Sequence, residues 1–199
     1  MNQQELWNER YQNKGHVWGA APNQFVADRL AALKPCRVLD LGAGQGRNAI
    51  WLAQQGHEVT AVDVSDVACA QAAEIAAEAG VAVEFIAADL QTWEPSADTF
   101  DLVVLAYIQA PDPIRQALHA KAARALRTGG SVFIIAHHKE NLDHGIGGPP
   151  MLEVLFDEET IAGDFPGFDA IENTQVIRHV EKDDASGDAI DLLFYATKR

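Results

Sequence analysis

A cluster of glycines and three acidic residues are the parts of this chain whose types and spacing could support chemistry. Gly42, Gly44 and Gly46 form the pattern G-x-G-x-G, directly after a short apolar run that contains Asp40. Glycine permits positive φ and lets a ligand approach the backbone closely. An amphipathic helix is predicted to follow, and its first turn would offer unpaired N–H groups. The stretch is therefore predicted to be the strand–turn–helix of a nucleotide-binding unit.

The residues around the glycines indicate which ligand the turn would take. The dinucleotide pattern G-x-G-x-x-G needs a glycine at position 47, where this chain has Arg47. Asp40 would repel a pyrophosphate and attract an ammonium or a sulfonium group. The pattern thus favours S-adenosylmethionine over NAD. The alternative is a glycine-rich turn that binds no ligand.

Two further acids end predicted strands downstream of the glycines. Asp63 closes the strand predicted over 57–63, at about the interval after Gly42 where a ribose-binding carboxylate is expected. Asp89 closes the strand predicted over 83–89. Both acids could instead be helix caps or loop residues.

Strands and helices alternate along the chain, which predicts an α/β fold. The nearly continuous apolar run 100–106 is typical of a strand buried on both faces, and the run 131–136 is the next strand. Helices are predicted over 23–34, from the cap at Ser65 or Asp66 to about 79, and from the Asp112–Pro113 start to about 126. The segments 168–181 and 188–197 read as a hairpin. We therefore expect a Rossmann-like, doubly wound, mostly parallel seven-stranded sheet with an antiparallel C-terminal hairpin.

The length of 199 residues suits a single domain over 1–199. Within it, residues 1–35 are expected to be an N-terminal segment packed on the core. This segment carries aromatic and basic residues with little apolar periodicity: Trp7, Arg10, Tyr11 and Trp18. They could simply pack against the domain, or they could form a lid over the ligand pocket.

Composition limits the classes of partner. The net charge of −14, from 15 basic and 29 acidic residues, argues against nucleic acid, because a phosphate backbone demands basic patches. Cys36 and Cys69 form no C-x-x-C pair, so no metal site or redox motif is indicated. No signal peptide or membrane span is recognised. We expect a cytoplasmic protein, monomeric or homodimeric, that acts on a small molecule.

Several motifs in order resemble those of class I S-adenosylmethionine-dependent methyltransferases over about residues 5–199. They are VLDLGAGQGRN, the acid-ended strands VTAVD and VEFIAAD, FDLVVLA, LRTGGSVFII and a terminal hairpin. The opening WNERYQNKGHVWGAAPNQF together with GQGRN is similar to the tellurite-resistance and thiopurine methyltransferase-like branch.

The resemblance implies roles for individual residues. Gly42, Gly44 and Gly46 would pass beneath the methionine part of the cofactor, with Asp40 near its ammonium group. The adenosine part would be held by Asp63 at the ribose, Val64 against the adenine face, Asp89 at the adenine amino group and Leu90 nearby. Ala106 and Tyr107 would face the methionine and the acceptor. Two further residues are expected at the cofactor apart from the resemblance. Arg10 could bind the cofactor carboxylate or an anionic acceptor, or be a surface arginine, and Trp18 would contact the cofactor as part of the lid.

Methyl transfer itself demands mainly alignment and exclusion of water. A thiolate or metalloid oxyanion acceptor needs little more, whereas a protonated oxygen or nitrogen acceptor needs a base. His137 and His138 follow the fifth predicted strand, at the edge where ligands of open α/β sheets bind, so either could be that base. The alternatives are a loop histidine pair without chemistry, a non-catalytic S-adenosylmethionine-binding module, and an NAD(P)-dependent oxidoreductase.

Overall fold

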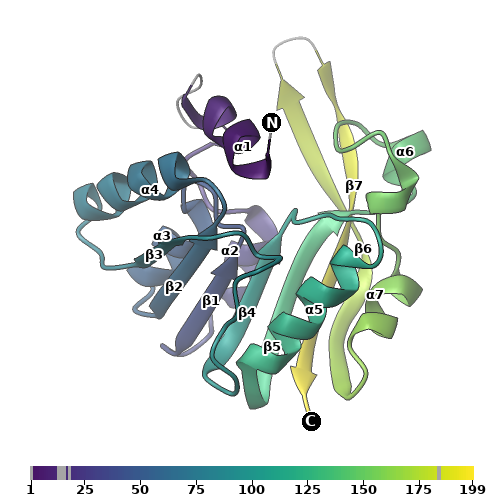
Figure 1. Ribbon diagram of the computed structural model, residues 1–199. Coiled ribbons are helices and arrows are strands. Elements are labelled where there is room, and N and C mark those ends of the chain that lie inside the picture. The colour runs from purple at the N-terminus through teal and green to yellow at the C-terminus, as the bar shows by residue number, and fades with distance from the viewer. Residues whose placement is uncertain (1, 13–16, 18, 183–184) are drawn as a thin grey trace.

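The computed structural model describes residues 2–12, 17, 19–182 and 185–199, so Trp18 lies outside the described residues. Seven strands form one sheet in the order β3-β2-β1-β4-β5-β7-β6 (Figure 1). They are β1 (Arg37–Leu41), β2 (Glu58–Asp63), β3 (Glu84–Ala87), β4 (Phe100–Ala106), β5 (Leu126–His137), β6 (Phe168–Lys182) and β7 (Ala185–Lys198). The first five run parallel, and β7 pairs antiparallel with both β5 and β6. The predicted fold class is confirmed.

Helices cover both faces of the sheet. They are α1 (Gln3–Gln12), α2 (Gln24–Leu30), α3 (Arg47–Gln54), α4 (Asp66–Glu78), α5 (Ile114–Ala125), α6 (Asn141–His144) and α7 (Glu158–Asp164), with a 3-10 turn η1 (Leu152–Val154). One apolar core joins α2 and α3 to the sheet, through residues such as Leu30, Leu52 and Phe133. The other joins α5 and α7 to the opposite face, through residues such as Ala122 and Ile161.

Local sequence explains where most elements begin and end. Ser65 Oγ accepts from Ala68 N at 3.0 Å and starts α4, as predicted, and Gly80 follows its end with φ of 70°. Asn23 caps α2, accepting from Phe25 N at 2.9 Å. This helix ends at Leu30, four residues before the predicted end at Lys34.

The structure corrects other predicted boundaries. Pro113, not Asp112, occupies the N-cap position of α5, and no side chain caps that helix. β5 begins at Leu126, five residues before the predicted start at Ser131, because Leu126 already pairs with Phe100 of β4. The pairing is then irregular and becomes regular again at Leu102 and Ser131. In the C-terminal hairpin, β6 ends at Lys182 and β7 begins at Ala185. The connection between the two strands is therefore shorter than the one predicted between residues 181 and 188.

The N-terminal segment forms a helix that the sequence pattern did not predict. α1 lies beside α4 (Figure 1), and its Asn8 joins the two helices. The Asn8 amide donates to Asp66 Oδ1 at 2.7 Å and accepts from Ser65 Oγ at 2.7 Å. These bonds and the buried Tyr11 side chain, rather than an apolar stripe, hold α1 against the domain.

Two structural features are absent from the described residues. None of their helices is long and apolar enough to cross a membrane. They contain no group of three or more histidine, cysteine, aspartate or glutamate side chains placed to hold a metal ion.

Candidate active site

The glycine turn connects β1 to α3 and is held against β2. Gly42 N and Ala43 N both donate to Val62 O, at 2.7 and 3.1 Å. Gly42 and Gly44 have φ of 72° and 55°. A Cβ on Gly42 would lie 2.0 Å from Ile108 Cδ1, and one on Gly44 would lie 2.6 Å from the Tyr11 hydroxyl. The positive φ favours glycine at both positions, and side chains from α1 and from the segment after β4 rest directly on the turn.

Asp63 ties the end of β2 to this turn. Its Oδ2 accepts from Gly44 N at 2.7 Å, and its Oδ1 accepts from Ser65 N at 2.9 Å. Burial raises the pKa of this carboxyl, while the backbone donors from Ser65 and Gly44 act against that rise. An ionised carboxylate has about four acceptor positions. Asp63 can hold the turn and still accept hydrogen bonds from a ligand hydroxyl.

Asp40 is a buried carboxylate with an unsatisfied oxygen. Its exposed fraction is 1%, and Oδ2 has no hydrogen-bond partner among the described residues. Burial, with a further contribution from the charge of Asp63, raises the pKa of Asp40 to about 7, although Arg47 opposes the rise. A buried carboxylate oxygen without a partner costs folding free energy unless a cation or a hydrogen-bond donor binds to it. A ligand that brings a positive charge to the glycine turn would supply the missing partner.

The segment after β3 carries the third predicted acid. Asp89 Oδ1 accepts from Gln91 N at 2.8 Å, which folds the segment into a tight turn beside β2. Lys121, from α5, closes the turn by donating to the carbonyl oxygens of Leu90, Gln91 and Trp93 at 2.9, 2.7 and 3.0 Å. β3 ends at Ala87, two residues before the predicted end at Asp89. Val64, directly after β2, and Leu90, three residues after β3, are both half-buried. Lys121 was not among the residues singled out from the sequence.

Tyr107 follows β4 in the left-handed region, with φ of 59°. Its hydroxyl donates to Asp191 Oδ2 at 2.7 Å and accepts from Arg178 Nε at 2.9 Å. The Asn23 amide also donates to this hydroxyl at 3.3 Å. Burial, together with the charge of Asp191, raises the pKa of Tyr107. The phenol is therefore a hydrogen-bond donor at neutral pH and no base.

The two predicted histidines are separated by the alternation of side chains along an extended chain. His137 lies on the side of Tyr107: the ring centroids are 5.0 Å apart, and Nδ1 is 3.2 Å from Asp191 Oδ1. His138 is buried among α7 and β6 residues. Its Nδ1 accepts from Glu140 N at 3.0 Å, and its Nε2 lies 3.1 Å from Glu158 Oε2. Only His137 joins the cluster around Tyr107.

The remaining predicted residues occupy more peripheral positions. Arg10 is exposed and stacks over Trp7, with its guanidinium carbon 5.2 Å from the ring centroid. Ala106 is half-buried at the end of β4. Arg47, which was not a predicted site residue, is half-buried at the start of α3, and burial lowers its pKa while the charge of Arg178 adds to the effect.

Sequence reasoning missed Arg178 and Asp191, which β6 and β7 bring to the same cluster. Asp191 is fully buried, and Arg178 Nε donates to its Oδ2 at 2.8 Å. One signal was available, because Asp191 is the single charged residue within the apolar run 189–197. A buried acid in such a run implies a specific partner.

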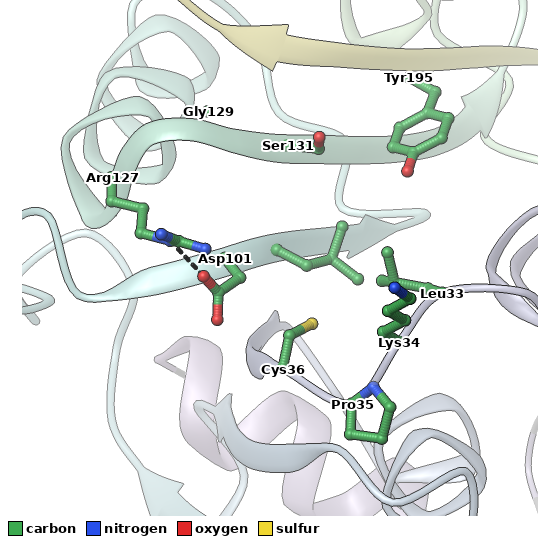
Figure 2. Close-up of a pocket in the computed structure, with 10 residues that line it drawn as sticks. Leu33, Lys34, Pro35, Cys36, Asp101, Arg127, Gly129, Ser131 and Tyr195 are labelled. Carbon is green, nitrogen blue, oxygen red and sulfur yellow. Dashed lines mark hydrogen bonds and ion pairs between the residues drawn. The ribbon is translucent and has the colours of Figure 1, made fainter.

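A separate cleft of about 290 Å³ lies at the opposite edge of the sheet, where β1, β4 and β5 begin (Figure 2). Asp101 pairs with Arg127 across its wall and accepts from Arg37 N at 2.8 Å. Burial, with Asp101 as a second cause, raises the pKa of the Cys36 thiol to about 11. This cleft therefore holds no activated thiol at neutral pH, and its charged pair is mutually satisfied.

Comparison with known proteins shows what this fold and this site are similar to. The sequence family described as "Methyltransferase domain" matches residues 38–130, which include the glycine turn, Asp63, Asp89 and Tyr107. TehB from Haemophilus influenzae superposes with a TM-score of 0.75 at 19% identity, over 98% of this chain and 67% of that one. The matched domain is a methyltransferase domain, and the fold is similar to that of the class I S-adenosylmethionine-dependent methyltransferases. The cofactor of that class is S-adenosylmethionine.

Within this class the chain resembles the TehB branch. The probable S-adenosyl-L-methionine-dependent methyltransferase TehB of Haemophilus influenzae is 50% identical over 38 residues, 19% of this chain and 13% of that protein. Hemagglutinin 1 of Eikenella corrodens is 27% identical over 175 residues, 85% of this chain and 56% of that protein. Ubiquinone biosynthesis O-methyltransferase of Pseudomonas aeruginosa is 34% identical over 113 residues, 54% and 47% of the two chains. The chain spans about half the length of its curated relatives, or less.

Proposed function

We propose that this chain binds S-adenosylmethionine at the glycine turn and transfers the methyl group to a small-molecule acceptor. The observation that carries the proposal is the buried Asp40 carboxylate, whose Oδ2 lacks a partner among the described residues beside the turn. The cofactor has an ammonium and a sulfonium group, and a buried carboxylate attracts both. The residues therefore fit the cofactor on charge.

Each part of the cofactor has a proposed partner. Asp40 would bind the ammonium group, and the glycine turn would pass beneath the methionine chain. Asp63 would accept from the ribose hydroxyls with the lone pairs that Gly44 and Ser65 leave unused. Asp89 would accept from the adenine amino group, between the side chains of Val64 and Leu90.

The chemistry asked of the protein is mainly alignment. The bound cofactor would supply a methyl group that its positive sulfur already activates. Tyr107, Ala106 and His137 would line the acceptor side, and Ile108 and Tyr11 would exclude water above the turn, since both side chains contact it.

A small acceptor suits the charge of the molecule better than nucleic acid does. The net charge of −14 opposes binding to a polyanion. The similarity to a ubiquinone biosynthesis O-methyltransferase supports an organic acceptor. The sequence resemblance to the tellurite-resistance and thiopurine methyltransferase-like branch leaves a metalloid oxyanion or a thiol open.

The test is isothermal titration of the protein with S-adenosylhomocysteine, with NAD as the control ligand. We expect binding of the first in the micromolar range and none of the second. Binding of NAD alone would contradict the proposal and favour an oxidoreductase. Binding of S-adenosylhomocysteine without methyl transfer to any acceptor would reduce the protein to a cofactor-binding module.

A matched pair of variants would localise the site. Asp40→Asn removes the buried charge, whereas Asp98→Asn makes the same change at an exposed position paired with Lys198. We expect the first to weaken S-adenosylhomocysteine binding by about 1–3 kcal/mol and the second to leave it unchanged. Equal affinities in the two variants would refute the role of Asp40.

A further inference from the structure

His137 and Asp191 are brought together by the pairing of β5 with β7. The antiparallel register places these two residues directly opposite each other, so their side chains share one face of the sheet. His137 Nδ1 lies 3.2 Å from Asp191 Oδ1. Both atoms are buried, and neither makes a hydrogen bond among the described residues, so their 3.2 Å contact is an ion-pair distance without hydrogen-bond alignment. Asp191 Oδ1 is therefore placed to pair with His137 Nδ1.

The carboxylate of Asp191 is fixed from its other side. Oδ2 accepts from the Tyr107 hydroxyl at 2.7 Å and from Arg178 Nε at 2.8 Å. Burial alone would raise the pKa of Asp191, but its contacts with His137, Arg178 and Tyr107 outweigh burial and lower it. Asp191 is thus ionised, immobile and turned towards the imidazole.

The imidazole is held so that only one nitrogen remains open. The Gln109 amide brackets the His137 backbone, accepting from its N–H at 3.2 Å and donating to its carbonyl at 3.4 Å. On one side of the ring, a Cβ on Gly148 would lie 2.9 Å from His137 Cγ, so the 147–148 backbone closes against it. Nε2 has no hydrogen-bond partner among the described residues, and the side chain keeps 13% exposure.

We propose that His137 and Asp191 form a proton-accepting dyad, and that the acceptor is a small organic molecule that attacks through a hydroxyl group. Asp191 is the positioning residue, which keeps a proton on Nδ1. Nε2 is then the unprotonated nitrogen that faces the acceptor. A thiolate or an oxyanion needs no such base, whereas a hydroxyl does. The proposal rests on the proposed methyl transfer and names its acceptor class.

The step balances with the groups named. The acceptor oxygen forms a bond to the methyl carbon while the carbon–sulfur bond breaks and leaves its electron pair on sulfur. The acceptor proton passes to His137 Nε2. The imidazolium that results faces the Asp191 carboxylate, which stabilises its charge, and the proton then leaves to solvent.

The first test measures the tautomer of His137 and does not depend on turnover. Long-range ¹H–¹⁵N spectra of the full chain at pH 8, assigned with His137→Gln, should show the proton on Nδ1. In Asp191→Asn, the Asn oxygen must serve Arg178 and Tyr107, so the Asn amide would donate to Nδ1 and move the proton to Nε2. Asp188→Asn, the same change on β7 at an exposed residue paired with His179, should leave the His137 signals unchanged. A wild-type proton on Nε2 would overturn the dyad.

The second test measures acceptor choice. Methyl transfer from labelled S-adenosylmethionine is followed with catechol and 4-hydroxybenzoate as hydroxyl probes, and with 2-mercaptoethanol and tellurite as probes that need no base. We expect transfer to a hydroxyl probe, a loss of kcat of about 100-fold or more in Asp191→Asn, and partial recovery in Asp191→Glu. The affinity for S-adenosylhomocysteine should not change.

Transfer only to 2-mercaptoethanol or tellurite would overturn the hydroxyl assignment while leaving the proposed methyl transfer intact. A full hydroxyl rate in Asp191→Asn would overturn the dyad. Failure of the wild-type protein to bind S-adenosylhomocysteine would instead defeat the proposed function, and the tautomer spectrum would still decide the His137–Asp191 pairing.

Discussion

Asp40 should make the proposed cofactor binding sensitive to pH. Its pKa of about 7 in the folded protein arises from burial and from the nearby charge of Asp63. A bound cation would favour the ionised form and lower that pKa, so binding should release a proton. The affinity for S-adenosylmethionine should therefore fall by roughly tenfold between pH 8 and pH 6. Calorimetric titration in buffers of different ionisation enthalpy measures both the affinity and the proton release.

The control for this prediction is Asp40→Asn, whose weaker affinity should be independent of pH over the same range. Ionisation of Asp40 has the opposite effect on the stability of the ligand-free protein. Because the folded pKa of Asp40 lies above its unfolded value, the contribution of this group to stability is lost as pH rises through 7. Asp40→Asn should thus stabilise the ligand-free protein at pH 8. An affinity for the wild type that stays constant from pH 6 to 8 would contradict the argument.

The adjacent histidines should separate in their mutational effects. His137→Gln should reduce turnover and leave cofactor affinity intact, because its ring lies in the cluster with Tyr107 and Asp191. His138 is 3% exposed, and both of its ring nitrogens contact Glu140 or Glu158. His138→Gln should cost about 1–3 kcal/mol of unfolding free energy and spare kcat.

Urea unfolding and initial rates on both variants check this prediction. A loss of kcat in His138→Gln at full cofactor occupancy would contradict the prediction and indicate that His138 takes part in turnover. The two histidines could not be distinguished from the sequence. Adjacent residues of an extended chain point to opposite faces, and the sequence does not show which face is turned towards Tyr107.

Residues that act through local geometry were predictable. Asp40, the three glycines and Asp63 lie within one βα unit and the following strand, where spacing along the chain fixes proximity. Asp191 and Arg178 depend instead on how the hairpin pairs with β5. A register shift of one residue would turn both away from Tyr107, and the sequence does not specify that register.

At the scale of elements, α5 supports the segment that carries Asp89. Lys121 donates to three carbonyl oxygens there, and its side chain keeps 15% exposure. Lys121→Met keeps the aliphatic stem and removes all three donors. We expect a loss of about 1–3 kcal/mol in the affinity for S-adenosylhomocysteine, because the segment proposed to hold the adenine is no longer fixed.

The matched control is Arg124→Met, one turn further along α5. Arg124 pairs with the same exposed Glu94 as Lys121 does but makes no contact with the Leu90–Trp93 carbonyls. Titration calorimetry on both variants, with homocysteine as a ligand that lacks adenosine, separates the effects. Equal losses for S-adenosylhomocysteine in the two variants would show that Lys121 acts only through surface charge.

The elements that sequence reasoning found are those with strong apolar patterns. The buried strand β4 and the alternation of strands and helices were sufficient for the fold class. α1 was missed because its sequence QQELWNERYQ is polar, and its attachment depends on Asn8 and on aromatic contacts rather than on a stripe. Helices held by individual polar bonds leave little periodic signal.

At the scale of the whole molecule, a buried ionic cluster joins α5 to α7 on the face of the sheet away from the glycine turn. Asp164 Oδ2 lies 2.7 Å from both Arg115 Nε and His119 Nδ1. Burial acts to raise the pKa of Asp164, but His119 and Arg115 outweigh it and lower the pKa. This carboxylate therefore stabilises the fold in its ionised form.

The sign of the pH dependence follows from that direction. Because the folded pKa of Asp164 lies below its unfolded value, its contribution is complete above about pH 5 and is lost as pH falls through the folded pKa. Asp164→Asn should cost about 3 kcal/mol at pH 7, since it leaves a buried guanidinium short of a partner. The difference between wild type and variant should shrink as pH falls below 4.

Urea unfolding at pH 7, 5 and 3 measures these differences, with Asp112→Asn as the matched control. Asp112 also pairs with Arg115, at 2.7 Å, but its side chain is 56% exposed. Its loss should cost about 1 kcal/mol or less. A wild-type advantage over Asp164→Asn that persists unchanged at pH 3 would mean that packing of α7, rather than the ionised carboxylate, supplies the stability. The cluster would then stabilise the fold through packing rather than charge, and any loss of stability at low pH would have to come from other acidic residues.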